Sequence, residues 1–93
     1  MNGEIAILEA VGNLNAETCN EFQNQVLAMV MENERVIVNC EKLSYVSSAG
    51  LRVFLIAQKR AKELKHKLIF QAINVDVYDV LEMTGFTEIL SIE

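Results

Sequence analysis

Short apolar runs typical of β-strands alternate with amphipathic helical segments along the whole of this 93-residue chain. The clearest run is Val36-Ile37-Val38, whose β-branched side chains are of the kind that fill buried strands. The segment at 49–64 instead carries its apolar side chains at helical spacing. Strands and helices that alternate in this way predict an α/β fold, with a mostly parallel sheet of four to five strands and three to four helices.

The predicted elements follow one another without a linker or a repeat. In chain order they are a strand at 5–11, a turn at 12–15, a helix at 16–31 capped by Asn15, a strand at 35–39, an irregular polar stretch to Tyr45, a helix at 49–64, a strand at 67–72, a helix at 75–84 capped by Asn74 and closed by Gly85, and a last strand at 87–91. We therefore expect one domain over residues 1–93, with a single core.

The charge balance argues against one class of partner, nucleic acid. The formal net charge is −5 and the pI is near 4.8, which argues against binding to nucleic acid. Basic residues do gather along and just after the helix at 49–64, where we expect a solvated face.

No apolar run approaches the roughly 20 residues that a membrane helix needs, and the first residues lack the basic start of a signal peptide. We expect a cytoplasmic protein without membrane insertion.

The metal-binding residue types are sparse. Cys19 and Cys40 stand apart from each other, and His66 is the one histidine in the sequence. This spacing lacks the paired cysteines of a zinc site, so we predict no metal and no cofactor, and we expect both thiols to be reduced and buried.

Two serines and a glycine stand where the predicted irregular stretch meets the helix at 49–64. Ser48 is the predicted N-cap, because serine commonly accepts a hydrogen bond from a backbone N–H at the start of a helix. The partial positive charge of a helix N-terminus would also stabilise a phosphate on this serine. Gly50 lacks a Cβ and would leave the backbone open to close approach by a partner. On the pattern alone, a simple helix cap is the favoured interpretation of Ser48.

An enzyme is the alternative class for these serines. His66 lies 18 residues beyond Ser48, or about 27 Å along a helix, so it is too far away to serve as a base. The segment also lacks the G-x-S-x-G elbow of serine hydrolases and the lysine of a phosphate-binding loop. We therefore expect no catalytic residues.

The element order and the central motif resemble the STAS domain family, and within it the single-domain anti-sigma factor antagonists. The matching segments are Gly12-x-Leu14-Asn15, Val36-Ile37-Val38-Asn39, Leu43-Ser44-Tyr45-Val46, Ser47-Ser48-Ala49-Gly50-Leu51 and Gly85-Phe86. The resemblance covers nearly the whole chain, and its middle stretch is the most specific part.

The resemblance implies a phosphorylation switch at Ser48, which aligns with the serine that is phosphorylated in the family. It implies an anti-sigma factor that is also a serine kinase as the partner of the unphosphorylated protein, and a serine phosphatase that resets the switch. Transcription that depends on the sigma factor would be regulated in this way. The residues expected to contact the partner are Asn15, Ser47, Ala49, Gly50 and Leu51.

The chain departs from the family pattern in charge and at its start. The family usually carries Asp at the positions of Asn15, Asn39 and Ser47, so each replacement keeps a hydrogen-bonding side chain but removes a negative charge. The family also commonly has another short strand first, of which residues 1–4 could supply only a remnant. We therefore expect an exposed sheet edge, and a monomer or a weak homodimer.

A second function fits the same resemblance. A constitutive STAS adaptor in a larger assembly, such as a lipid transporter or a stress-signalling scaffold, would use Ser48 only as a cap. The missing carboxylates favour the adaptor, whereas the short stand-alone sequence favours the antagonist.

Overall fold

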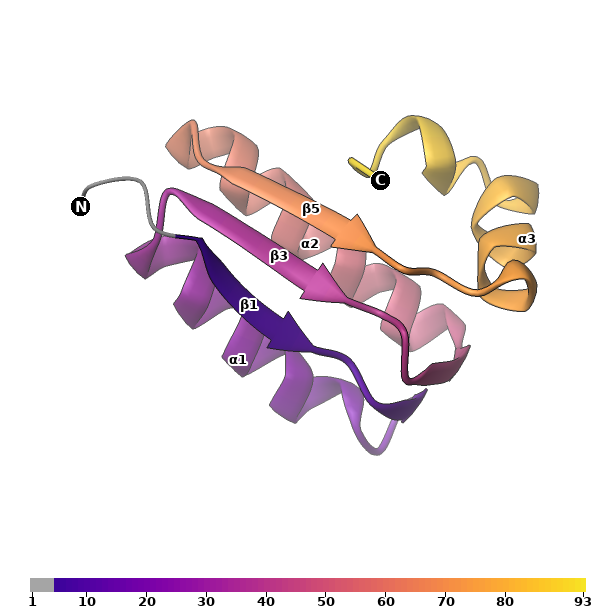
Figure 1. Cartoon of the computed structure of the whole chain (residues 1–93). Helices are drawn as coiled ribbons and strands as arrows, with labels where there is room; N and C mark the ends of the chain where they lie inside the picture. Colours follow the sequence, from indigo (N-terminus) through magenta and orange to yellow (C-terminus); the bar gives the residue numbers. More distant parts are fainter. Residues whose placement is uncertain (1–4) are drawn as a thin grey trace.

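The computed structural model describes residues 5–93 and has the α/β architecture that the sequence predicts (Figure 1). Its elements are β1 (Ala6–Glu9), β2 (Gly12–Leu14), α1 (Cys19–Glu32), β3 (Arg35–Asn39), β4 (Leu43–Val46), α2 (Ser48–Leu64), β5 (Lys67–Gln71), α3 (Val75–Met83) and a 3-10 helix, η1 (Phe86–Glu88). The predictions for β3, α2, β5 and α3 are confirmed to within one residue at each end.

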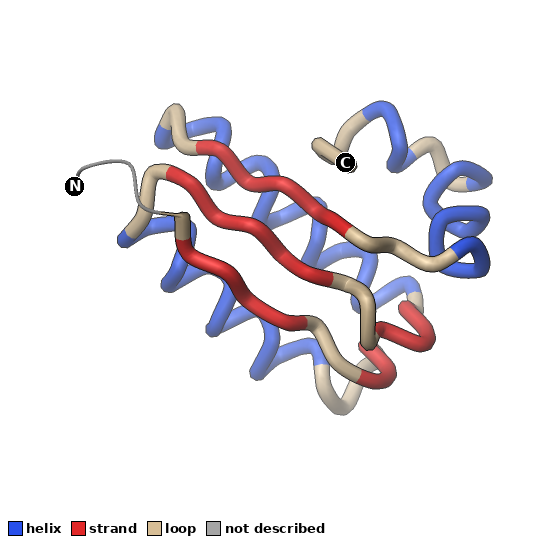
Figure 2. The backbone as a smooth tube through the Cα atoms, viewed as in Figure 1, coloured by secondary structure: helices blue, strands red, loops and turns tan. Residues whose placement is uncertain are grey.

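The five described strands form two parallel groups. Strands β1, β3 and β5 make a three-stranded sheet in that order, with β3 at its centre, and β2 pairs with β4 beyond the ends of these strands (Figure 2). Helices α1 and α2 lie side by side on one face of the three-stranded sheet, and α3 lies beyond the carboxyl end of β5, where it contacts β4 (Figure 1). The carboxyl ends of the strands therefore lead toward the β2–β4 pair.

The core lies between this sheet and the two long helices. Phe54 of α2 is fully buried, and its ring centroid lies 6.1 Å from that of Phe22 in α1 and 4.7 Å from that of Phe70 in β5. Val36 and Val38 of β3 are also buried and alternate with more exposed residues along the strand. The apolar face of α2 thus packs on the sheet, as predicted, and meets the buried side chains of β3 that alternate along the strand.

Three predicted segments differ from the structure. The predicted strand at 5–11 ends at Glu9, and residues 12–14 form the second strand β2 instead of a turn. The stretch predicted to be irregular contains β4, which pairs with β2. The predicted last strand at 87–91 is wrong, because the chain turns through η1 and only Ile92 bridges to Phe70 of β5. The suggestion that residues 1–4 form part of a strand lies outside the described residues.

The start of α3 is the prediction that the structure matches most closely. Asn74 Oδ1 accepts a hydrogen bond from the backbone N–H of Val77 at 2.8 Å, as an N-cap does. Its Nδ2 donates to the carbonyl oxygen of Leu43 at 2.7 Å, so the same side chain ties α3 to β4. Gly85 ends the region with φ 81°, which is the left-handed conformation expected of it.

The helices of the described part of the chain are all too short or too polar to cross a lipid bilayer.

Candidate functional site

The site is built where the parallel strands β2 and β4 end next to each other. Leu14 is the last residue of β2 and pairs with Val46, the last residue of β4. Immediately beyond, the backbone N–H of Ser47 donates a hydrogen bond to the carbonyl oxygen of Leu14 at 2.8 Å. This bond places the loop that follows β2 beside the first turn of α2. Asn15 and Ser48, which come next along the two segments, therefore lie at the same edge of the fold.

The N-cap of α2 is Ser47, which corrects the prediction of Ser48. Ser47 has extended backbone angles, and its Oγ accepts a hydrogen bond from the N–H of Gly50 at 3.4 Å. Its carbonyl oxygen accepts the first helical bond, from Leu51 N at 2.8 Å. The cap is set by the end of β4, because the bond to Leu14 holds the backbone of Ser47 in an extended conformation and the next residue is the first that can be helical.

Ser48 is therefore the first residue within α2. Its side chain is exposed, and no hydrogen bond of its hydroxyl is present among residues 5–93. Arg52 follows one helical turn later and is also exposed, so the two side chains share a face of the helix at i, i+4 spacing. A free hydroxyl at a helix N-terminus, with a guanidinium one turn away, is well placed to carry a phosphate.

Gly50 has a different role from the one that the sequence suggested. It is buried, and a Cβ at this position would lie 2.6 Å from Val46 Cγ2, 2.9 Å from Leu14 Cβ and 3.0 Å from the Leu14 carbonyl oxygen. The absence of a side chain lets α2 approach β2 and β4, and the expected opening toward a partner is wrong. Leu51 is also buried, with 7% of its surface exposed, whereas Ala49 is half-buried.

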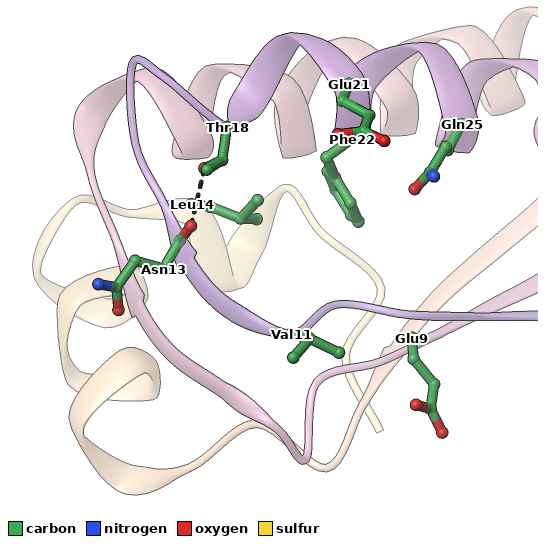
Figure 3. Close-up of a pocket in the computed structure, with 8 residues that line it drawn as sticks. All are labelled: Glu9, Val11, Asn13, Leu14, Thr18, Glu21, Phe22 and Gln25. Atoms are coloured by element: carbon green, nitrogen blue, oxygen red, sulfur yellow. Dashed lines mark hydrogen bonds between the residues drawn. The ribbon is translucent and has the colours of Figure 1, made fainter.

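Asn15 organises the loop that leads from β2 to α1. Its Oδ1 accepts hydrogen bonds from the backbone N–H groups of Glu17 at 2.9 Å and Thr18 at 3.2 Å. The Thr18 hydroxyl in turn donates to the carbonyl oxygen of Asn13 at 2.7 Å (Figure 3). The predicted cap thus closes a turn just before the helix, and α1 itself starts three residues later than predicted, at Cys19. The loop is half-buried at Asn15 and offers this residue at the edge of the site.

A shallow hollow of about 280 Å³ lies on the other side of the same loop, between α1 and the first two strands (Figure 3). Its wall includes Thr18, Phe22 and Gln25 of the α1 side and Glu9 and Asn13 of the strand side. Ser47 and Ser48 do not line it.

Asn39 fastens its own turn. Its Oδ1 accepts a hydrogen bond from the N–H of Glu41 at 2.9 Å, which shapes the connection from β3 to β4. Within the described residues, the side chain makes no hydrogen bond to Ser47 or Ser48. All three positions where the family usually has Asp thus hold a neutral side chain that accepts a backbone N–H.

The other candidate chemical groups lie away from this edge. Cys19 and Cys40 are buried and free, as predicted, and burial raises the pKa of the Cys40 thiol from 9.0 to about 12. Since the thiolate is the reactive form, Cys40 is unreactive at neutral pH. His66 follows the far end of α2, with Nδ1 2.8 Å from the carbonyl oxygen of Val30. The histidine and Ser48 therefore lie at opposite ends of a 17-residue helix.

Comparison with known proteins identifies the family. The family model of the STAS domain matches residues 1–93. The chain belongs to the STAS domain family. BtrV of Bordetella bronchiseptica, whose name describes it provisionally as an anti-sigma factor antagonist, is 32% identical over 89 residues, which are 95% of this chain and 75% of BtrV.

Solved STAS structures share the fold. A protein of Thermotoga maritima, named provisionally as an anti-sigma factor antagonist, superposes with a TM-score of 0.85 at 20% identity, over 95% of this chain and 77% of the other. The unphosphorylated anti-sigma factor antagonist SpoIIAA gives a TM-score of 0.73 at 15% identity, over 97% and 79% of the two chains. Phosphorylated SpoIIAA of Bacillus gives 0.71 at 16% identity, over 100% and 86%.

Sequence reasoning missed three contributors to this STAS site. The carbonyl oxygen of Leu14 is a backbone group that every residue has, so the residue type at position 14 could not predict its role. The hydrogen bond of Thr18 was missed because Asn15, three residues before it, is a stronger N-cap candidate and marks the expected start of the helix. Arg52 was assigned only to the solvated face of α2, although its i, i+4 spacing from Ser48 is readable from the sequence.

Proposed function

We propose that this STAS protein is an anti-sigma factor antagonist that is switched by phosphorylation of Ser48. In the unphosphorylated state it binds an anti-sigma factor that is also a serine kinase, and the sigma factor is released for transcription. Phosphorylation of Ser48 by that kinase breaks the complex, and a serine phosphatase restores it. The observation that carries the proposal is the exposed, unengaged hydroxyl of Ser48 at the start of α2.

The position of Ser48 explains how one phosphate can end binding and leave the fold intact. A phosphoserine adds about −1.5 to −2 charges and three acceptor oxygens. On this exposed residue the phosphate displaces no core atom, and the first turn of α2 and Arg52 both favour negative charge. A partner surface packed over the same residue would have to desolvate that charge, which opposes binding.

The neutral replacements preserve the local structure that this mechanism needs. Asn15 and Asn39 keep the turns that an Asp would close, and Ser47 keeps the helix cap. None of the three adds a carboxylate that would repel a phosphate on Ser48. The phosphorylated state of this protein should therefore be electrostatically easier to form than in a relative with three Asp residues.

The proposed contact surface is smaller than the one expected from the sequence. Ser48, half-buried Ala49 and Asn15, and exposed Tyr45 of β4 can meet a partner. Gly50 and Leu51 support that surface from below, because they are buried. The protein acts in this proposal by binding alone, without catalysis, in the cytoplasm where an ATP-dependent kinase operates.

The adaptor function remains the second candidate, because three carboxylates of the family pattern are replaced here. An experiment that separates the two incubates the wild-type protein, Ser48→Ala and Ser47→Ala with the anti-sigma factor kinase of the same genome, ATP and magnesium. Intact-mass spectrometry should find one added phosphate on the wild type and on Ser47→Ala, and none on Ser48→Ala. An unmodified wild type that still binds a protein partner would favour the adaptor.

A further inference from the structure

The face of the three-stranded sheet opposite α1 and α2 carries a row of three isoleucines. Ile7, Ile37 and Ile69 are aligned across β1, β3 and β5, because Ile7 pairs with Ile37 and Ile37 with Ile69. Ile7 is 61% exposed, and the other two are partly exposed. No described helix or strand covers this face, which is turned toward the viewer in Figure 1. A contiguous apolar row on an open sheet indicates an interaction surface.

The two ends of this face differ in charge. At the start of the strands, Arg35 and Lys67 are paired neighbours and both are exposed. At the other end, Glu9, Asn39 and Gln71 form the matching row. Glu9 shares a 3.7 Å ion pair with exposed Lys42, and such a surface pair exchanges partners at little cost. The face thus runs from a cationic row, through the isoleucine row, to a row of acceptors.

We infer that this face binds a second copy of the chain, with the strands of the two copies antiparallel. A two-fold axis along the isoleucine row lays that row on itself, with each strand over the same strand of the other copy. Arg35 and Lys67 of each copy then lie over the amide side chains of Asn39 and Gln71 of the other, whose oxygens can accept their hydrogen bonds, and Glu9 lies over the start of β1. With the strands parallel, Arg35 on the central strand would instead meet Arg35 of the other copy. Because the order of the three rows is self-complementary, it favours a second copy as the partner and antiparallel strands as the orientation.

Other occupants fit this face less well. An anionic membrane surface would match only the cationic end of the face and would leave the row of Glu9, Asn39 and Gln71 without complementary groups. Pairing of two copies through the free edge of β1 would leave the isoleucine row uncovered. The sheet-on-sheet contact covers it, with side chains of the two faces interdigitating at the spacing of about 10 Å usual for stacked sheets.

The size of the face sets the strength of the contact. Two strands of five residues and one of four span a patch of about 220 Å² at ordinary strand spacing, which is well below the roughly 800 Å² per partner of a standard interface. Interfaces of this size are weak, so we expect a dimer that forms only at high local concentration, with a dissociation constant on the order of 100 μM. Ser48 is the first residue of α2, which lies on the opposite face of the sheet, so it takes no part in this contact. The inferred dimer is therefore independent of the proposed function.

Sedimentation equilibrium of the full chain between about 10 μM and 1 mM tests this inference. The wild type should show a reversible monomer–dimer equilibrium, and Ile37→Glu should weaken it at least tenfold. Met83→Glu is the matched control, since Met83 is 85% exposed on α3 away from the face, and it should dimerise like the wild type. Circular dichroism verifies that each variant is folded.

Lys67→Glu provides a second test at an exposed position, in case Ile37→Glu does not fold. It sets a carboxylate over the acceptor row of the other copy and should weaken the dimer several-fold. A wild type that stays monomeric at 1 mM would overturn the inference. So would a dimer that survives both substitutions, which would indicate pairing through the β1 edge, or binding of anionic vesicles by a monomeric wild type.

Discussion

The backbone N–H of Ser47 donates a 2.8 Å hydrogen bond to the carbonyl oxygen of Leu14, and this bond joins the two loops of the site. Leu14 ends β2 and Ser47 follows the end of β4, so the bond continues the parallel pairing of these strands by one step. It determines which serine caps α2 and which serine is exposed. The pairing of two short strands therefore decides that Ser47 is the helix cap and that Ser48 is the exposed residue.

The close approach of α2 to these strands predicts that Gly50→Ala is destabilising. The new Cβ would overlap Val46 and Leu14, including a backbone oxygen that cannot rotate away. Overpacking of this kind costs about 1–3 kcal/mol in the free energy of unfolding, and each kcal/mol lowers Tm by about 4–8 °C in a domain of this size. Thermal unfolding followed by circular dichroism measures the change. Lys59→Ala, at an exposed position of the same helix, is the control, and an equal Tm for both variants would contradict the predicted overlap.

The two serines should respond differently to truncation. Ser47→Ala removes the N-cap and should cost about 0.5–1 kcal/mol, at the lower end of the usual range because the capping bond is 3.4 Å long. Ser48→Ala removes an unengaged hydroxyl and should change stability by less than about 0.5 kcal/mol. Urea unfolding of both variants checks this order. The reverse order would mean that Ser48 is the cap after all.

A negative charge at residue 48 should stabilise the fold. Ser48→Asp places a carboxylate in the first turn of α2, where the helix dipole contributes about 0.3–1 kcal/mol, and Arg52 at i+4 adds about 0.2–0.5 kcal/mol. A double-mutant cycle with Arg52→Ala, measured by urea unfolding at low salt, separates the two contributions. If Ser48→Asp destabilises the protein with Arg52 present, the phosphate would not be tolerated as we propose.

Burial of Cys40 predicts a pH dependence at the alkaline end. Its pKa is raised from 9.0 to about 12 by desolvation, so the folded state holds the proton more tightly than the unfolded state. The associated stability is complete below pH 9 and is lost as the pH rises from 9 toward 12. A Cys19→Ala variant isolates this thiol. At pH 8 it should react with iodoacetamide only after unfolding in urea, and a fast reaction of the folded variant would show that the thiol is accessible.

The sequence predicted the segments whose apolar pattern is strong. Val36-Ile37-Val38 is a continuous β-branched run, and α2 has a continuous apolar stripe, so both elements were located to within one residue. Strand β4 was missed because its buried residues, Leu43 and Val46, are three apart and enclose two exposed positions. That spacing is not the period of two that identifies a strand. Only its pairing with β2 makes this segment a strand.

The sequence predicted the start of α2 to within one residue but assigned its cap to the wrong serine. Two adjacent serines before a helix have similar capping preference, so local rules cannot choose between them. The choice depends on the contact between Ser47 and Leu14, which are 33 positions apart in the sequence. The same contact makes Gly50 a packing residue. Such long-range backbone contacts are not encoded in any single motif.

The central claim is that phosphorylation of Ser48 controls binding of an anti-sigma factor kinase, and a direct affinity measurement tests it. Isothermal titration should compare the unphosphorylated wild type, the fully phosphorylated wild type, Ser48→Asp and Ser48→Ala, each against the kinase from the same genome. We predict that the unphosphorylated protein and Ser48→Ala bind with similar affinity. The two charged forms should bind about 100-fold more weakly, equivalent to about 2.7 kcal/mol. Equal affinity of the phosphorylated and unphosphorylated proteins would contradict the switch.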